Sequence, residues 1–83
     1  MTETQLRTYL KGRFRGYEDS LTTEADLSGV VDSLGLFELA EFVEGASGIR
    51  IPASEFRPAR FASIRDILVF VEELRQRQSV SSR

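Results

Sequence analysis

The residues that could do chemistry in this chain are a serine and its acidic neighbours near the middle of the sequence. Asp32 and Ser33 open the longest amphipathic run, and a serine hydroxyl can act as a nucleophile or receive a transferred group. The side chains that usually activate such a hydroxyl are missing, because the chain contains no histidine and no cysteine. The sole lysine, Lys11, belongs to the first predicted helix, and nothing in the sequence places it near Ser33. We therefore expect no catalytic residue in this chain and expect another protein to modify Ser33.

The same absences limit metal binding and covalent crosslinks. Without histidine and cysteine, the usual nitrogen and sulfur ligands of zinc are lacking, so we expect no metal site. Zero cysteines also exclude a disulfide framework and agree with a reducing compartment.

A helix from about residue 33 to residue 46 must position the serine. Asp32 is expected to be its N-cap, accepting backbone N–H groups of the first turn. Four apolar residues at helical spacing would face the core: Leu36, Leu39, Ala40 and Val43. Leu34, Glu38 and Glu41 would project to the opposite side. An exposed leucine and two acids beside an accessible hydroxyl indicate a docking surface for a partner.

The segments before this helix supply a first helix and a long loop. Thr2 and Gln5 have the spacing of a capping box, which predicts a helix near residues 3–14. Its apolar stripe consists of Leu6, Leu10 and Phe14. Residues 16–32 lack sustained periodicity and are predicted to form a loop, and loops of this length are often functional. Side chains expected to pin the loop to the core are Leu21, Leu27 and Val30 or Val31.

The segments after it are predicted to contain one short helical turn and a last helix. Residues 49–52 alternate like a strand but are too short to form a sheet, so we expect a buried loop anchor. Residues 53–57 should form one helical turn, ended by Pro58, and Phe56 and Phe61 should fill the core. Ser63 should cap a last helix, which would fray from Gln76 onward. The apolar stripe of that helix consists of Ile64, Ile67, Leu68, Val71 and Leu74.

Length and hydropathy suit one small soluble domain. We expect a single domain over residues 1–78 and a flexible tail over residues 79–83. No apolar run of about 18 residues and no leader pattern is visible, so the expected location is the cytoplasm, with no membrane contact.

Charge is segregated along the chain. Residues 16–49 contain eight acids and no base, whereas residues 1–15 and residues 50–83 each carry a net charge of +3. A negative field around Ser33 would attract basic partner surfaces and repel phosphate backbones, which disfavours nucleic-acid binding. The structural alternative is a solvated acidic helix face with no partner.

The combination of these motifs resembles the acyl carrier protein family. The residues that carry the resemblance are Asp32-Ser33-Leu34 at a helix start, Gly29 upstream, residues 48–52 (Gly-Ile-Arg-Ile-Pro), and Phe61-x-Ser63-Ile64. The match extends from about Leu6 to Leu74, nearly the whole chain. The resemblance implies an all-α, small four-helix bundle with three main helices, one short helix and a long first loop.

The resemblance also implies a function. In this family the motif serine, here Ser33, is esterified by 4'-phosphopantetheine from coenzyme A, whose thiol holds acyl or aminoacyl groups as thioesters. A cysteine-free chain would obtain its sulfur in this way. The implied partners are a phosphopantetheinyl transferase, a loading ligase or acyltransferase, and a downstream synthase or transferase, with the carrier acting as a monomer. Residues expected to contact partners are Asp32, Leu34, Phe37, Glu38, Glu41 and Glu44, although Phe37, like Phe42, could instead pack in the core.

Two departures from the family pattern affect the expected partners. Gly35 follows the motif leucine, and residues 45–47 (Gly-Ala-Ser) stand where fatty-acid carriers usually continue the acidic character. The chain therefore looks more like free-standing carriers of specialised metabolism, such as polyketide or antibiotic biosynthesis. Alternatives are an aminoacyl or D-alanyl carrier and an unmodified, carrier-like interaction scaffold. Gly35 could leave room beside Ser33 for the arm or a partner, or could mark a frayed first turn.

Overall fold

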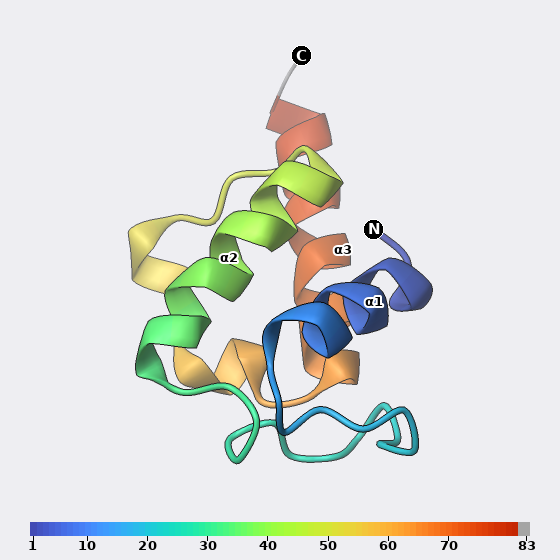
Figure 1. The fold of residues 1–83 in the computed structure, drawn as a ribbon. Coiled ribbons are helices and arrows are strands. Elements are labelled where there is room, and N and C mark those ends of the chain that lie inside the picture. The colour runs from blue at the N-terminus through green and yellow to red at the C-terminus, as the bar shows by residue number, and fades with distance from the viewer. Residues whose placement is uncertain (82–83) are drawn as a thin grey trace.

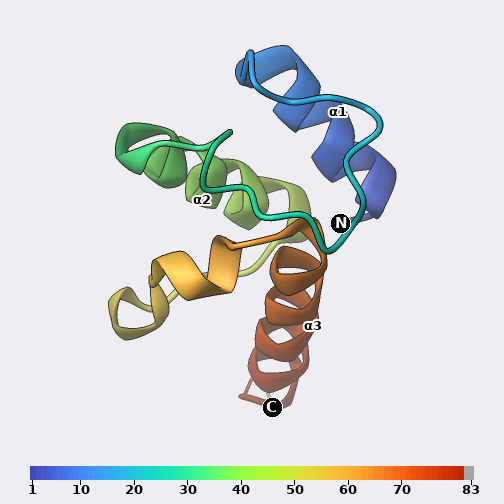
Figure 2. The same ribbon diagram turned by 90° about the horizontal axis from the view of Figure 1, so that it is seen from below.

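The computed structural model describes residues 1–81, and the side chains of residues 1–78. It contains three α-helices: α1 (Glu3–Arg13), α2 (Ser33–Ser47) and α3 (Ile64–Ser81). Two 3₁₀ turns, η1 (Ala53–Glu55) and η2 (Pro58–Phe61), lie between α2 and α3. Within residues 1–81 there is no strand, so the predicted all-α class is confirmed. In Figures 1 and 2 the three helices surround a common centre and the long first loop crosses one end of them.

The short fourth element differs from the prediction. We expected a single turn ended by Pro58, but the chain forms two successive 3₁₀ turns, and Pro58 begins the second of them. A proline fits the first position of a helical turn because its missing N–H would have no partner there and its φ is already helical. Pro58 therefore starts the second turn, whereas the first has already ended at Glu55.

The helix starts follow the predicted capping residues. Thr2 and Gln5 form both bonds of a capping box at α1. At α3, the backbone N–H of Asp66 donates to the Ser63 hydroxyl oxygen at 3.0 Å. The end of α2 is set by Gly48, whose φ of 68° lies in the left-handed region that favours glycine. These local features place each helix within a residue or two of its predicted start.

The core is formed by side chains from all three helices and from the loops. The predicted stripe residues are buried or packed against the core, and Ile49 and Phe61 are buried as expected. Phe70 is also fully buried, although the stripe predicted for α3 omitted it. The buried apolar side chains are Leu6, Leu10, Tyr17, Leu27, Leu39, Val43, Ile49, Phe61, Ile64, Ile67, Phe70, Val71 and Leu74.

The long loop is bonded to the start of α3. Leu27 is buried, and its backbone N–H donates to the carbonyl oxygen of Ala62 at 2.7 Å. The backbone N–H of Arg65 donates to the carbonyl oxygen of Thr23 at 2.8 Å. The predicted loop is thus confirmed. These two hydrogen bonds hold its middle beside the start of α3 (Figure 1).

The end of α3 corrects a prediction. We expected fraying from Gln76, but the helix continues to Ser81. The side-chain amide of Gln78 bonds both the N–H and the carbonyl oxygen of Arg50, and Arg77 pairs with Glu55 at 2.7 Å. These bonds tie Arg77 and Gln78 to the segment after α2. Residues 82–83 of the predicted tail lie outside the described residues.

No helix within residues 1–81 is long and apolar enough to cross a membrane.

Candidate functional site

Ser33 is the first residue of α2, and its side chain is exposed. The backbone N–H of Gly35 donates to Oδ1 of Asp32 at 2.7 Å, so Asp32 is the N-cap, as predicted. Because the cap is made by Asp32, the Ser33 hydroxyl is not needed for it. Within residues 1–78 that hydroxyl has no hydrogen-bond partner in the protein.

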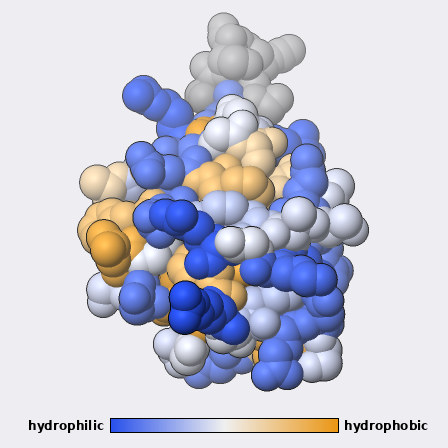
Figure 3. All heavy atoms as spheres, in the orientation of Figure 1, coloured by the Kyte–Doolittle hydropathy of each residue, from blue (hydrophilic) through white to orange (hydrophobic). Residues whose placement is uncertain are grey.

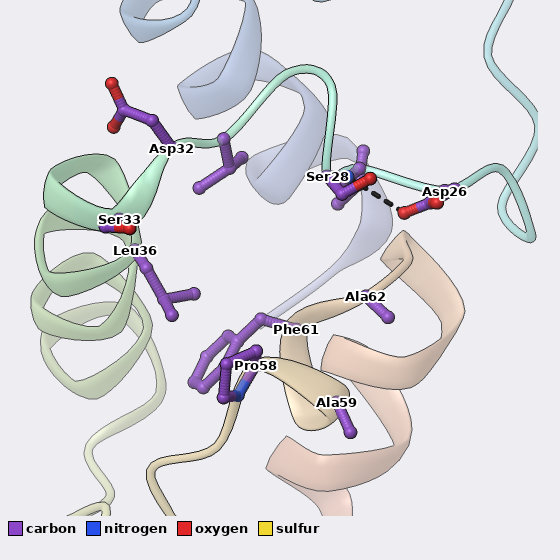
Figure 4. A pocket seen from close by; sticks show the side chains of 11 residues that line it. Asp26, Ser28, Asp32, Ser33, Leu36, Pro58, Ala59, Phe61 and Ala62 are labelled. Atoms are coloured by element: carbon purple, nitrogen blue, oxygen red, sulfur yellow. Dashed lines mark hydrogen bonds between the residues drawn. The ribbon is translucent and has the colours of Figure 1, made fainter.

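A cavity of about 340 Å³ opens beside Ser33. It lies between the start of α2, the end of the long loop and η2, and Leu36 of α2 points across it toward Pro58 and Phe61 of η2 (Figure 4). Its lining is mostly apolar, with Asp26, Ser28 and Asp32 at the loop side. The sequence did not predict this cavity, because it forms between segments about 25 residues apart and Phe61 had been assigned only to the core.

The exposed side of α2 carries apolar residues. Leu34 is 72% exposed and Phe37 is 60% exposed, so the core alternative for Phe37 is wrong. The ring of Phe37 contacts that of Phe56, with centroids 4.9 Å apart, at the surface of η1. Phe42, the other open case, is half-buried and stacks on Tyr9 with centroids 4.1 Å apart. Figure 3 shows hydrophobic surface over α2 and the segment after it, interrupted by hydrophilic side chains.

A shallow second groove of about 240 Å³ lies between α2 and η1. Phe37, Ala40, Ile51 and Phe56 form its apolar part. Two of the predicted docking acids, Glu41 and Glu44, are at its edge.

The predicted docking acids of α2 are not equivalent in the structure. Glu38 forms a two-point ion pair with Arg13, in which Arg13 Nε lies 3.1 Å from Glu38 Oε1. This pairing raises the pKa of the Arg13 guanidinium. Glu44 accepts the backbone N–H of Ile51 at 2.7 Å and so holds the loop after α2. Glu41 is exposed, and no ion-pair or hydrogen-bond partner for it exists within residues 1–78.

Gly35 has a packing reason that neither sequence alternative included. A Cβ at this position would lie 2.5 Å from Cε1 of Phe14 and 3.0 Å from Oδ1 of Asp32. Gly35 is buried, and the ring of Phe14, the residue that follows α1, lies against it. The first turn of α2 is therefore held by contact with Phe14, which contradicts both a frayed turn and an open space at Gly35.

The site contains no group that would activate the serine. The side chains that line the cavity include carboxylates but no histidine, lysine or arginine. Within residues 1–78, no three acidic side chains come together as metal ligands. The arrangement offers an accessible hydroxyl at a helix start, an apolar cavity beside it and an apolar, partly acidic helix face.

Comparison with known proteins agrees with this arrangement. No family model matches the chain. The chain is 30% identical over 78 residues to a protein described as probable acyl carrier protein PigG from Serratia sp., and the aligned region covers 90% of each chain.

Proposed function

This chain belongs to the acyl carrier protein family, and we propose that Ser33 is the residue on which it carries 4'-phosphopantetheine. As a member of that family it is a carrier protein and not an enzyme. The observation that supports Ser33 most directly is its free, exposed hydroxyl at the first position of α2, one residue after the side chain that caps the helix.

The residues at the start of α2 suit a phosphate attached to Ser33. The first backbone N–H groups of a helix have no intrahelical partner, and the helix dipole favours negative charge at that end. Asp32 satisfies the N–H of Gly35, which leaves the N–H groups of Ser33 and Leu34 for a phosphate. The adjacent cavity could shelter an apolar part of the arm or its cargo. The attached group would supply the thiol that this cysteine-free chain lacks.

We further propose that the exposed face of α2 is the partner surface. Its members are Asp32, Leu34, Phe37, Glu38, Glu41 and Glu44, of which Leu34 and Phe37 are exposed apolar side chains. The proposed partners are a phosphopantetheinyl transferase, a ligase or acyltransferase that loads the thiol, and a downstream synthase or transferase. We place the carrier in the cytoplasm as a monomer, with residues 1–78 as its domain.

For the pathway, we propose specialised metabolism of the polyketide kind, with an aminoacyl or D-alanyl carrier as the alternative. The support is the weakened acidic character at the end of α2, where Gly45, Ala46 and Ser47 stand. Loading assays separate the two. The modified protein is incubated with its own loading enzyme and either a malonyl or an aminoacyl donor, because a carrier accepts the group that its own loading enzyme supplies.

The test of the attachment site is a transfer assay. The purified protein is incubated with a broad-specificity phosphopantetheinyl transferase, coenzyme A and magnesium, and its intact mass is measured. We expect one added phosphopantetheinyl group on the wild type and none on Ser33→Ala. If the wild type stays unmodified while a known carrier is modified in the same tube, the carrier proposal fails and the unmodified scaffold becomes the better interpretation.

A further inference from the structure

An ion pair joins the end of α1 to the proposed partner face of α2. Arg13, the last residue of α1, bonds both carboxylate oxygens of Glu38, which lies five residues after Ser33 on α2. The two residues are 25 positions apart, so the pair exists only because α1 packs against α2. Both side chains are partly exposed, at 51% and 36%, and a docking protein can therefore reach them.

The ion pair lies on a packed support. Tyr9 stacks on Phe42 with an angle of 9° between the rings, and the ring of Phe14 covers Gly35. The first contact joins the middle of α1 to the later half of α2, and the second joins the residue that follows α1 to the first turn of α2. Exposed ion pairs usually contribute little because two long side chains must be ordered to form them. Here the helices are already fixed, and the fork of Arg13 meets the carboxylate at two points.

The neighbouring acids of α2 provide a contrast. Glu44 is bonded to the backbone of Ile51, whereas Glu41 is exposed and has no partner within residues 1–78. A basic side chain of a docking protein can therefore bind Glu41 directly. To bind Glu38, it must first displace Arg13.

We propose that Arg13 is an internal competitor that sets how strongly basic partners engage α2. The inference rests on the proposed function, because it requires partners that dock on this face. The partner surface that fits best has one arginine or lysine opposite Glu41 and an apolar depression for Leu34 and Phe37. A second cation opposite Glu38 adds little while Arg13 remains in place.

The test compares two substitutions on the same helix. Arg13→Gln removes the competitor, and Lys11→Gln is the matched control because Lys11 also forms one exposed ion pair, with Asp19 at 3.1 Å. Both variants lose one positive charge from α1. The readout is kcat/KM for modification of the carrier by a broad-specificity phosphopantetheinyl transferase with coenzyme A. We expect Arg13→Gln to raise kcat/KM about threefold at low salt, through faster association, and Lys11→Gln to leave it nearly unchanged.

Salt and a double-mutant cycle identify the mechanism. The gain should disappear at about 1 M salt, where the Debye length falls to about 3 Å. In a Glu38→Gln background, Arg13→Gln should give no further gain, because the carboxylate that Arg13 occupies is absent. Arg13→Lys, which keeps the charge but loses the two-point geometry, should give an intermediate gain. Circular dichroism confirms that each variant is folded.

The outcomes separate this inference from the proposed function. If the wild type is modified but Arg13→Gln and Lys11→Gln behave alike, or if the gain persists without Glu38, the competitor role of Arg13 is wrong and the attachment site stands. If the wild type is not modified at all, the proposed function fails, and this inference fails with it.

Discussion

Two serines stand at helix starts in this molecule, and their surroundings are opposite. Ser63 precedes α3, is 7% exposed, and accepts the N–H of Asp66 at 3.0 Å. Ser33 is the first residue of α2 and is exposed, and its hydroxyl makes no hydrogen bond within residues 1–78. The difference arises because the two serines stand one position apart relative to their helices. Ser63 is itself the cap, whereas at α2 the cap is made by Asp32, the residue before the serine.

The comparison shows that a serine at a helix start can either cap the helix with its hydroxyl or leave that hydroxyl available to other molecules. A serine at the cap position has its oxygen used by the backbone and is covered by the packing around it. A serine one position later, behind an aspartate cap, leaves its oxygen to solvent while the helix start remains satisfied. At α2 this oxygen also has a cavity beside it and apolar side chains exposed near it.

The largest expected effect comes from replacing each of the two serines in turn by alanine. Ser33→Ala should abolish modification completely and change the free energy of unfolding by less than about 0.5 kcal/mol. Ser63→Ala should cost about 1 kcal/mol of stability, through the lost cap, and leave modification intact. Intact mass after the transferase reaction and denaturant unfolding measure the two effects. A folded Ser63→Ala protein that cannot be modified would contradict the assignment.

The next expected effect tests whether the start of α2 is held more tightly than its end. Gly35→Ala should destabilise the protein by about 2 kcal/mol, because the new methyl group would lie 2.5 Å from the ring of Phe14. Gly45→Ala is the matched control on the same helix, since no atom other than those of its chain neighbours and its own helix backbone lies within 4 Å of its Cβ position. We expect it to stabilise by about 0.5 to 1 kcal/mol.

Thermal and denaturant unfolding of both glycine variants provide the measurement. Equal effects of the two substitutions would show that Phe14 does not press on the first turn of α2. Phe14→Leu in the Gly35→Ala background should restore part of the lost stability, because it removes the ring atoms that the methyl group meets.

The smallest expected effect concerns the exposed apolar residues of the two helices. Leu34 on α2 is 72% exposed and Val69 on α3 is 48% exposed. Leu34→Ala should lower kcat/KM of the transferase about fivefold, because a truncated contact residue commonly costs about 1 kcal/mol of binding. Val69→Ala should leave it within about twofold. A similar loss in both variants would mean that the partner surface is not confined to α2.

Much of the fold could be predicted because the relevant signals are local. The caps at Thr2, Asp32 and Ser63 depend on bonds that span three residues, so the sequence contains both partners of each bond. The core stripes follow from helical periodicity. Phe70 was available to the same rule, since it lies three residues after Ile67 and four before Leu74, but the predicted stripe omitted it.

The missed features depend on segments that are distant in sequence. The cavity beside Ser33 needs η2 to lie against the start of α2, and the reason for Gly35 is the ring of Phe14, 21 positions earlier. The helical end of α3 is supported by bonds between Gln78 and Arg50, which are 28 positions apart. Composition alone predicted a frayed end there because it contains no information about that contact.

Charge shows most clearly what the sequence determined and what the tertiary structure decided. The sequence determined that the acids gather in residues 16–49 and that the bases flank them. In the folded protein, basic residues from the flanking segments form ion pairs with acids of that segment: Lys11 pairs with Asp19, Arg13 with Glu38 and Arg65 with Glu24. Which carboxylates stay available to a partner, Glu41 above all, is set by these pairs. The net charge is a sum over the sequence. An ion pair, in contrast, requires two groups within a few ångströms of each other, and only the packing of the helices brings them that close.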